Sequence, residues 1–190
     1  MDDRKYRSLF TDLPSFETER LVLRKITYAD LYDMYDYSRE EEVSRYLLWS
    51  PHLNLDETKG NIELIQKECQ KGRYTNWGVA LKENGILIGT CGFAAIDRYN
   101  NKGEIGYVLS HRYRSKGYMR EAALKVLSIG FDILGLNRIE ARILIGNTNS
   151  EKLAMSIGMR YEGTMKNALY IKGQYKSFSY YGITAEDYYK

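Results

Sequence analysis

The stretch GEIGYVLSHRYRSKGYMREAALKVLSIGFDIL, residues 103–134, decides the fold class. Gly103–Ser110 predicts a strand, and Tyr118–Leu134 predicts a helix that ends at Gly135. The polar residues of this helix recur at helical spacing, at Glu121, Lys125, Ser128 and Asp132. They form one narrow stripe, so we expect the rest of the helix to pack against a sheet.

A second strand is predicted directly after this helix, over residues 138–146. Its side chains alternate, with Ile139, Ala141, Ile143 and Ile145 on one face and Arg138, Glu140 and Arg142 on the other. A strand, a crossover helix and a further strand imply one parallel pair of strands.

The flanking sequence predicts antiparallel strands around that pair. Asn84-Gly85 is a strong hairpin signal, Lys172-Gly173 turns the last two strands, and Thr27 with Asp30 resembles a capping box. The predicted strands are 19–24, 77–82, 86–96, 103–110, 138–146, 160–170 and 174–184, and the predicted helices are 27–38, 56–71, 118–134 and 150–157. The fold class is therefore α/β (α+β), with a mixed, mostly antiparallel seven-stranded sheet and about four helices.

The composition is that of one globular domain over residues 1–190, with residues 1–13 expected to form a loose N-terminal arm. With 44% hydrophobic and 28% charged residues, the chain lacks the composition of a disordered protein. The net charge of +3 is too small to indicate a nucleic-acid partner. A basic, tyrosine-rich nucleic-acid binder is the weakest alternative, because the 18 tyrosines are scattered along the chain.

Targeting signals and metal-binding patterns are not found in the sequence. The first thirty residues lack the apolar region of a signal peptide, and no segment approaches ~18 apolar residues, so no membrane association is expected. Cys69 and Cys91 are expected to be free thiols, which favours the cytoplasm. With His52 and His111 as the only histidines and no Cys/His spacing of a zinc site, we expect no metal.

The loop Arg114–Met119 lies between the predicted strand and the predicted helix. The N-terminus of a helix presents free N–H groups and the positive end of its dipole, which together favour a phosphate group. Arg114 and Lys116 add positive charge, and Gly117 allows a close approach of the backbone. The alternative is an ordinary turn with solvated basic residues. The loop lacks the spacing of a nucleotide P-loop.

The motif Arg114-x-x-Gly117-x-Met119 resembles the Q/R-x-x-G-x-G/A pyrophosphate loop of the GNAT superfamily of N-acetyltransferases. Four further segments resemble its branch of ribosomal-protein N-terminal acetyltransferases, which includes RimJ and RimL. They are Glu17–Arg24 (ETERLVLR), Gly103–Leu109 (GEIGYVL), Asn147-x-x-Ser150 and Gly158-Met159-x-x-Glu162-Gly163. The resemblance runs in order over residues 16–184.

Three positions depart from the family pattern. Met119 stands where the family prefers glycine or alanine, and Ser115 stands where this branch often has glycine. Ala154 stands where many members carry a tyrosine that serves as general acid. The departures at Ser115 and Met119 bear on the geometry of the loop, and the alanine removes the common proton donor.

The resemblance implies acetyl-CoA as co-substrate and no metal. It implies a GNAT fold in which strands 104–110 and 138–146 splay apart, so that Val108 and Leu109 offer backbone groups to the pantetheine arm. The implied pyrophosphate contacts are Arg114, Ser115, Lys116, Gly117, Tyr118 and Met119. Asn147 would bond the pantetheine arm, or it is simply a turn residue.

The resemblance also implies two catalytic groups. Glu104 is the candidate base, and because an ordinary glutamate near pKa 4.3 is a weak base, we expect it to be partly desolvated or to act through water. Ser150 is the candidate proton donor for the leaving thiolate. The alternatives are a surface carboxylate at Glu104 and a helix cap at Asn149 or Ser150, where Thr148-x-x-Glu151 is also a capping box.

The implied reaction is direct acetyl transfer to a primary amine, and a protein N-terminal α-amine is the favoured acceptor. About a tenth of such an amine, with a pKa near 8, is neutral at pH 7, against less than about one part in a thousand of a lysine. A polyamine, an amino acid or an antibiotic is the alternative acceptor, and a non-catalytic CoA sensor is the alternative function. The tyrosine-rich closing strands could pair between the subunits of a homodimer.

Overall fold

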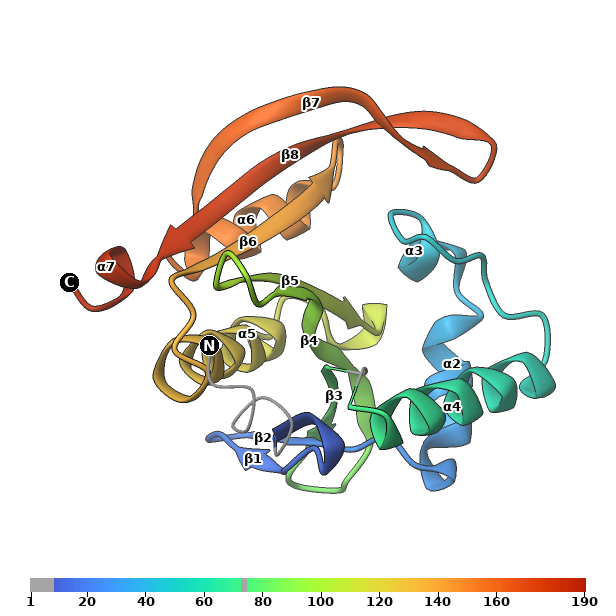
Figure 1. Ribbon diagram of the computed structural model, residues 1–190. Coiled ribbons are helices and arrows are strands. Elements are labelled where there is room, and N and C mark those ends of the chain that lie inside the picture. Colours follow the sequence, from blue (N-terminus) through green and yellow to red (C-terminus); the bar gives the residue numbers. More distant parts are fainter. Residues whose placement is uncertain (1–8, 73–74) are drawn as a thin grey trace.

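The computed structural model describes residues 9–72 and 75–190, and within them one eight-stranded sheet forms the centre of the molecule (Figure 1). Its strand order is β1-β2-β3-β4-β5-β6-β8-β7, and every neighbouring pair is antiparallel except β5 and β6. The strands are β1 (Phe16–Glu17), β2 (Leu21–Arg24), β3 (Asn76–Leu81), β4 (Leu87–Asp97), β5 (Lys102–Leu109), β6 (Arg138–Leu144), β7 (Arg160–Ile171) and β8 (Gln174–Thr184). The predicted mixed sheet with one parallel pair is confirmed.

The predicted helices form, and three further short helical elements join them. The helical elements are η1 (Tyr28–Asp30), α2 (Leu31–Ser38), α3 (Glu41–Ser44), α4 (Leu55–Gln70), η2 (His111–Tyr113), α5 (Tyr118–Ser128), η3 (Ile129–Ile133), α6 (Thr148–Ser156) and α7 (Ala185–Tyr188). The helix predicted over 118–134 is α-helical in α5 and π-helical in η3. The elements α3, η2 and α7 were not predicted, because three or four residues are too few to show a helical period.

Two expectations about the N-terminal region differ from the structure. The sheet has eight strands rather than seven, because Phe16 and Glu17 pair with Leu23 and Val22. Residues 9–13, expected in a loose arm, contribute three buried side chains to the core, Leu9, Phe10 and Leu13. The rest of the expected arm, residues 1–8, lies outside the described residues.

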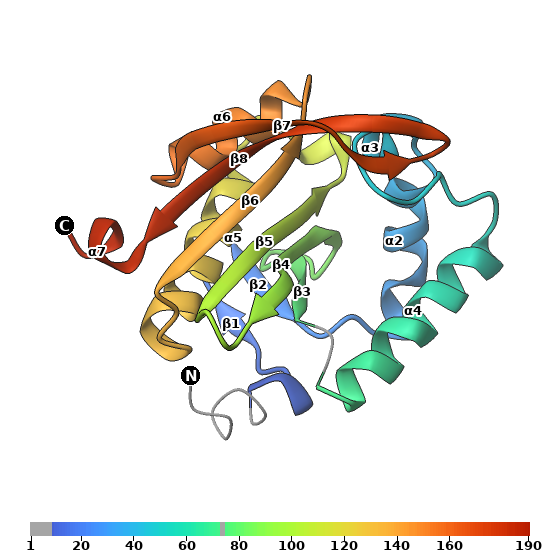
Figure 2. The ribbon, with the colours of Figure 1, turned by 45° about the horizontal axis from the view of Figure 1, so that its top comes forward.

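Two hydrophobic clusters lie on opposite faces of the sheet, and α5 covers one face while α2 and α4 cover the other (Figure 2). Neighbouring residues of β4 separate into the two clusters, since Ile88 packs in the first and Leu87 in the second. The apolar side of α5 is buried as predicted, with Ala122, Ala123, Val126 and Leu127 fully covered.

The parallel pair separates soon after it begins. Strands β5 and β6 pair only at three positions, the last of which joins Glu104 to Glu140. Beyond that point β5 continues to Leu109 and β6 to Leu144, each bonded to its other neighbour, β4 or β8. The two strands therefore form an open V, and among residues 9–72 and 75–190 no strand pairs with the edge of β5 that faces β6 after Glu104.

The β7–β8 hairpin arches away from the sheet toward α3 (Figure 1). At its tip the Lys172 ammonium donates a hydrogen bond to the carbonyl oxygen of Ser44, at 2.9 Å. The hairpin and α3 thus meet above the open end of the V, and this contact frames the region where β5 and β6 diverge.

Candidate active site

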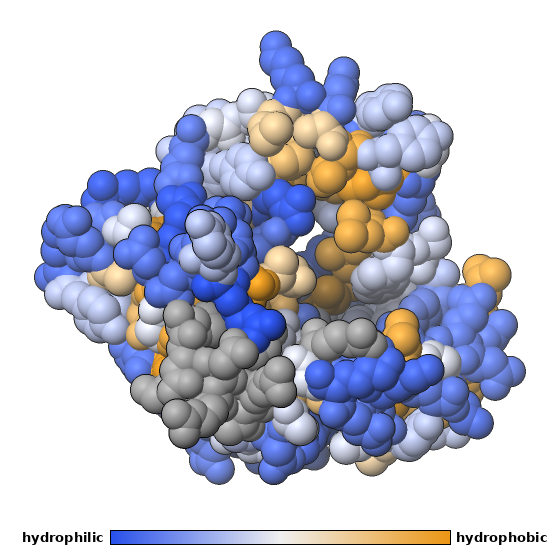
Figure 3. Space-filling view, viewed as in Figure 1, coloured by the Kyte–Doolittle hydropathy of each residue, from blue (hydrophilic) through white to orange (hydrophobic). Residues whose placement is uncertain are grey.

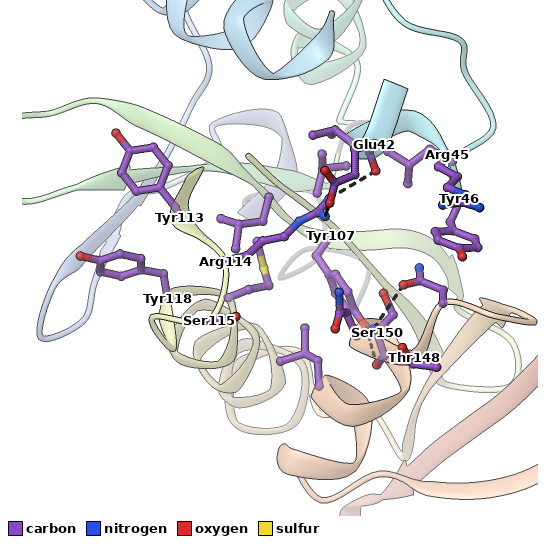
Figure 4. A pocket seen from close by; sticks show the side chains of 18 of the residues that line it. Glu42, Arg45, Tyr46, Tyr107, Tyr113, Arg114, Ser115, Tyr118, Thr148 and Ser150 are labelled. Carbon is purple, nitrogen blue, oxygen red and sulfur yellow. Dashed lines mark hydrogen bonds and ion pairs between the residues drawn. The ribbon is translucent and has the colours of Figure 1, made fainter. Parts of the chain in front are cut away.

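A cavity of about 470 Å³ lies at the open side of the V (Figure 4). Four segments and Leu153 of α6 line it. The segments are the end of β5 at 107–109, the loop and start of α5 at 113–120, the β6–α6 connection at 146–150, and the segment 42–47. The cavity therefore joins the predicted anion loop to the unpaired edge of β5, as an extended ligand with a phosphate end would require.

The candidate anion loop contains two left-handed residues directly before α5. Ser115 and Gly117 both lie in the left-handed region, with φ of +62° and +81°, and α5 begins at Tyr118. Glycine adopts a left-handed conformation such as that of Ser115 more readily than serine does. The first amides of α5 have no intrahelical partners, so they can donate to an anion.

Met119 does not obstruct this loop. Its side chain is 6% exposed and packs in the main core. The thioether fills space between α5 and the sheet, so the side chain does not cover the backbone amide of Met119 from the cavity side.

The N-terminal motif fastens the loop to the sheet. Arg20 places its Nε 2.7 Å from Oε2 of Glu121, donates to the carbonyl oxygen of Lys116 at 3.0 Å, and lies over the Tyr118 ring at 4.6 Å. The Thr18 hydroxyl also donates to Glu121. Burial would raise the pKa of Glu121, but these hydrogen bonds lower it below its usual value. The motif quoted for the family resemblance thus holds the first turn of α5 in place.

Acidic residues of α2, of α3 and of the connection between them pair with the basic residues around the loop. Arg114 places Nη1 2.7 Å from Oε1 of Glu42, and Arg112 and His111 pair with Asp36 and Glu40 (Figure 4 shows the first pair). The candidate pyrophosphate ligand Arg114 is therefore already held by a carboxylate that lines the same cavity.

A second cavity, of about 250 Å³, adjoins the first across the V. The two share five lining residues, Tyr46, Leu47, Tyr107, Asn147 and Ser150. The second cavity is also lined by parts of β5, β6 and the β7–β8 hairpin. A ligand in the first cavity can therefore meet a second ligand at the shared residues.

Glu104 lines the second cavity and not the first. Both of its oxygens are bound by Arg142, with Oε1 2.9 Å from Nε and Oε2 2.7 Å from Nη2, and its side chain is 16% exposed. These hydrogen bonds raise the pKa of Arg142. The sequence pattern put Arg142 on the polar face of its strand but gave no sign that it would hold the candidate base.

Ser150 and Asn147 lie where the two cavities meet. Helix α6 begins at Thr148 with Asn147 as its N-cap, and Oδ1 of Asn147 accepts from the Ser150 amide at 3.4 Å. The alternative that Asn149 or Ser150 caps this helix is therefore wrong. Within the described residues the Ser150 hydroxyl has no hydrogen-bond partner, and it remains available to a ligand.

Two tyrosines at the junction were missed by the sequence reading. The Tyr107 hydroxyl donates to the carbonyl oxygen of Ser150 at 3.3 Å, and burial raises its pKa (Figure 4). The Tyr46 hydroxyl donates to the carbonyl oxygen of Gly146 at 2.9 Å. Ala154 is fully buried, so the position of the common family tyrosine belongs to the core. Neither Tyr46 nor Tyr107 could be singled out among 18 tyrosines without the structure.

The structure gives no support to cysteine chemistry or to a metal site within the described residues. Burial raises the pKa of Cys91, so this thiol is in an inert setting. In the part of the chain that the structure describes, no group of three or more His, Cys, Asp or Glu side chains could hold a metal ion, and no helix is long and apolar enough to cross a membrane.

Known proteins resemble this chain in sequence and in fold. It is 36% identical over 157 residues to the Bacillus licheniformis protein named "Uncharacterized N-acetyltransferase p20", covering 83% of this chain and 88% of the relative. It is 25% identical over 178 residues to the Escherichia coli "[Ribosomal protein uS5]-alanine N-acetyltransferase", covering 90% of each.

Two solved structures share the fold. An acetyltransferase of the GNAT family from Bacillus anthracis has a TM-score of 0.81 at 28% identity, covering 91% of this chain and 99% of that one. The spermidine N-acetyltransferase from Vibrio cholerae, solved with CoA and spermine, has a TM-score of 0.76 at 21% identity, covering 91% and 100%. The family described as "Acetyltransferase (GNAT) domain" matches residues 20–160. With that match over most of its length and with the splayed sheet described above, this chain belongs to the GNAT family of acetyltransferases.

Proposed function

We propose that this protein transfers the acetyl group of acetyl-CoA to a primary amine, and that its acceptor is a protein N-terminal α-amine. The observation that carries the proposal is the pair of adjoining cavities at the V between β5 and β6. One cavity carries the anion loop, and the other carries the candidate base.

The first cavity suits acetyl-CoA residue by residue. The amides of residues 114–119 and the charges of Arg114 and Lys116 would hold the pyrophosphate. Val108 and Leu109 lie in the part of β5 whose second edge pairs with no strand of the described chain, so the pantetheine arm could bind there as an added strand. Asn147 would meet the arm near the V while it caps α6.

The chemistry requires a base and a proton donor at the junction. In direct transfer the amine nitrogen bonds to the thioester carbonyl carbon and the carbon–sulfur bond breaks. Glu104 would accept the proton that the amine loses, through a water held on its remaining lone pairs, since Arg142 occupies one position on each oxygen. Ser150 would donate a proton to the departing thiolate.

The choice of an α-amine rests on its chemistry and on one relative. The neutral fraction of an α-amine at pH 7 is far larger than that of a lysine side chain. A weak base such as Glu104 therefore has to deprotonate fewer of the amines that bind. The E. coli relative bears the name of an enzyme for the N-terminal alanine of a ribosomal protein. A polyamine or another small amine is the alternative acceptor, and the spermidine enzyme is similar in fold alone.

The test is to measure acetylation of a peptide panel, by mass spectrometry and by thiol release, with wild type, Glu104→Gln and Glu140→Gln. Glu140 is the matched control, since it faces Glu104 in the strand register, pairs with Lys102 and Arg138, and lines neither cavity. We expect Glu104→Gln to lower kcat/KM by about 10²–10⁴ with an unchanged Kd for acetyl-CoA, and Glu140→Gln to leave kcat/KM near that of wild type.

The outcomes separate the alternatives. Full kcat/KM in Glu104→Gln at every pH would remove Glu104 from the base role. Binding of acetyl-CoA without any acetylated product would favour a CoA sensor, which the loss of the family tyrosine at Ala154 makes worth testing.

A further inference from the structure

Acetyl transfer needs a hydrogen-bond donor for the carbonyl oxygen of the thioester. When the amine nitrogen bonds to the carbonyl carbon, one electron pair of the C=O bond moves onto this oxygen as negative charge. A fixed donor aimed at that charge lowers the barrier of the reaction. The first cavity carries the anion loop and the second carries Glu104, so the donor is expected where the two cavities meet.

Four of the five residues that the cavities share have a side-chain donor, namely Tyr46, Tyr107, Asn147 and Ser150. The Tyr46 hydroxyl is already bound to the carbonyl oxygen of Gly146 at 2.9 Å. Asn147 caps α6 with its side-chain oxygen and would meet the pantetheine arm. Ser150 would serve the departing sulfur, which leaves Tyr107 as the donor for the carbonyl oxygen.

The Tyr107 hydroxyl is only weakly held by the protein. It donates to the carbonyl oxygen of Ser150 at 3.3 Å, beyond the ~2.5–3.0 Å of an ordinary O–H···O hydrogen bond. Figure 4 shows the ring reaching from β5 to the start of α6. A hydroxyl has one proton and turns about its C–O bond, so it can exchange this weak contact for an oxygen that carries more negative charge.

The surroundings of Tyr107 favour a neutral donor. Burial raises the pKa of its hydroxyl, so the proton stays in place at neutral and mildly basic pH. Hydrophobic residues gather around the hollow at the centre of the molecule, between the β7–β8 hairpin and α3 (Figure 3), and Leu47 lines both cavities. In such surroundings a hydrogen bond to a developing charge stabilises it more than the same bond does in water.

Resting on the proposed function, we infer that Tyr107 is a catalytic residue whose hydroxyl turns from the Ser150 carbonyl to the thioester oxygen as negative charge develops there. Tyr107 transfers no proton. The amine proton goes to Glu104 and then to solvent, the sulfur takes a proton from Ser150, and Ser150 regains one from solvent. When the carbon–sulfur bond breaks, the electron pair on oxygen re-forms the C=O bond and the hydroxyl is released.

The experiment measures kcat and the Kd for CoA in Tyr107→Phe, with the best substrate of the peptide panel and with spermidine as acceptors. We expect kcat to fall by about 10²–10³ for each amine that wild type acetylates, with the Kd for CoA unchanged. Tyr35→Phe is the matched control and should keep the wild-type kcat. It also removes a phenol hydroxyl bound to a main-chain carbonyl, that of Leu53 at 3.5 Å, and it lines neither cavity.

A second variant, Tyr107→3-fluorotyrosine, separates catalysis from a structural role. It keeps the ring and the hydroxyl and makes the hydroxyl a stronger donor, so kcat at neutral pH should be at least that of wild type.

A wild-type kcat in Tyr107→Phe would overturn the inference while leaving acetyl transfer intact. An equal loss in Tyr46→Phe would also overturn it, because the shape of the junction would then set the rate. A loss in Tyr107→3-fluorotyrosine as large as that in Tyr107→Phe would count against it in the same way. Acetyl-CoA binding with no acetylation of any amine would instead remove the proposed function, and the inference with it.

Discussion

Replacing Glu42 by glutamine should tighten the binding of CoA. Arg114, the expected pyrophosphate ligand, has its guanidinium held by the Glu42 carboxylate at 2.7 Å, and both residues line the same cavity. A pyrophosphate must compete with that carboxylate for Arg114, and it is also repelled by the negative charge. Glutamine keeps the shape of the side chain and removes the charge.

The size of the effect follows from the exposure of the pair. The Glu42 side chain is 66% exposed and that of Arg114 is 30% exposed, so solvent screens their attraction. Exposed pairs of this kind contribute about 0.2–1 kcal/mol. Releasing Arg114 should therefore lower the Kd for CoA by about 1.4- to 5-fold.

The assay is isothermal titration with CoA, which has no acetyl group to transfer, at low and high salt. Asp36→Asn is the matched control, since it removes the same charge from the neighbouring pair with Arg112 and does not line the cavity. The gain in CoA affinity from Glu42→Gln should be smaller at high salt, and it should also be smaller when Arg114 has been replaced by glutamine. A Kd that rises in Glu42→Gln would refute this reasoning, because Glu42 would then orient Arg114 for the ligand. An equal fall in the Kd for CoA in Asp36→Asn would show that the effect comes from the change in net charge and not from the release of Arg114.

Three further predictions concern stability, each measured by thermal unfolding or denaturant titration. Ser115→Gly should raise Tm by about 2–4 °C, because glycine relieves the left-handed φ of +62° and the net gain is about 1 kcal/mol. Asp30→Asn should cost about 3 kcal/mol at pH 7, because Asp30 is buried against Arg24. Burial would raise the pKa of Asp30, but hydrogen bonds from Arg24 lower it, so its contribution is present above about pH 4 and is lost as pH falls through the folded pKa. The deficit of Asp30→Asn relative to wild type should therefore shrink in acid, and a deficit that stays constant to low pH would contradict this assignment. Gly89→Ala should destabilise by about 2–3 kcal/mol, because the new Cβ would lie 2.1 Å from a backbone oxygen of β5, whereas Gly60→Ala in α4 meets nothing within 4 Å and should be neutral or stabilising.

Much of the fold could be predicted because local patterns encode it. The alternation of 138–146 and the narrow polar stripe of α5 fix which faces are buried, and a strand on each side of a helix fixes the parallel pair. The Asn84-Gly85 turn joins two antiparallel strands, and the Thr27 amide donates to Asp30 in the predicted capping box. The alternation failed at Ile145, which is 52% exposed because β6 has already ended.

The position of the candidate anion loop is the part of the site that the sequence by itself determined. Its place at the start of α5 and the glycine at position 117 depend on neighbours within a few positions, and such preferences can be predicted from the chain, whereas the left-handed conformation of Ser115 was not predicted. The candidate residues Glu104, Asn147 and Ser150 could be named from the sequence. The sequence could not predict that all three would line the same cavity.

Only the tertiary structure decided how the rest of the site closes. Glu104 meets Arg142 across 38 residues of sequence, Arg114 meets Glu42 across 72, Tyr46 meets Gly146 across 100, and Lys172 meets Ser44 across 128. Local sequence periodicity does not predict such contacts, because they arise where separately formed elements pack against one another. The segment 42–48 shows this most clearly: it has little regular pattern of its own, yet packing carries it over the V, where it lines both cavities.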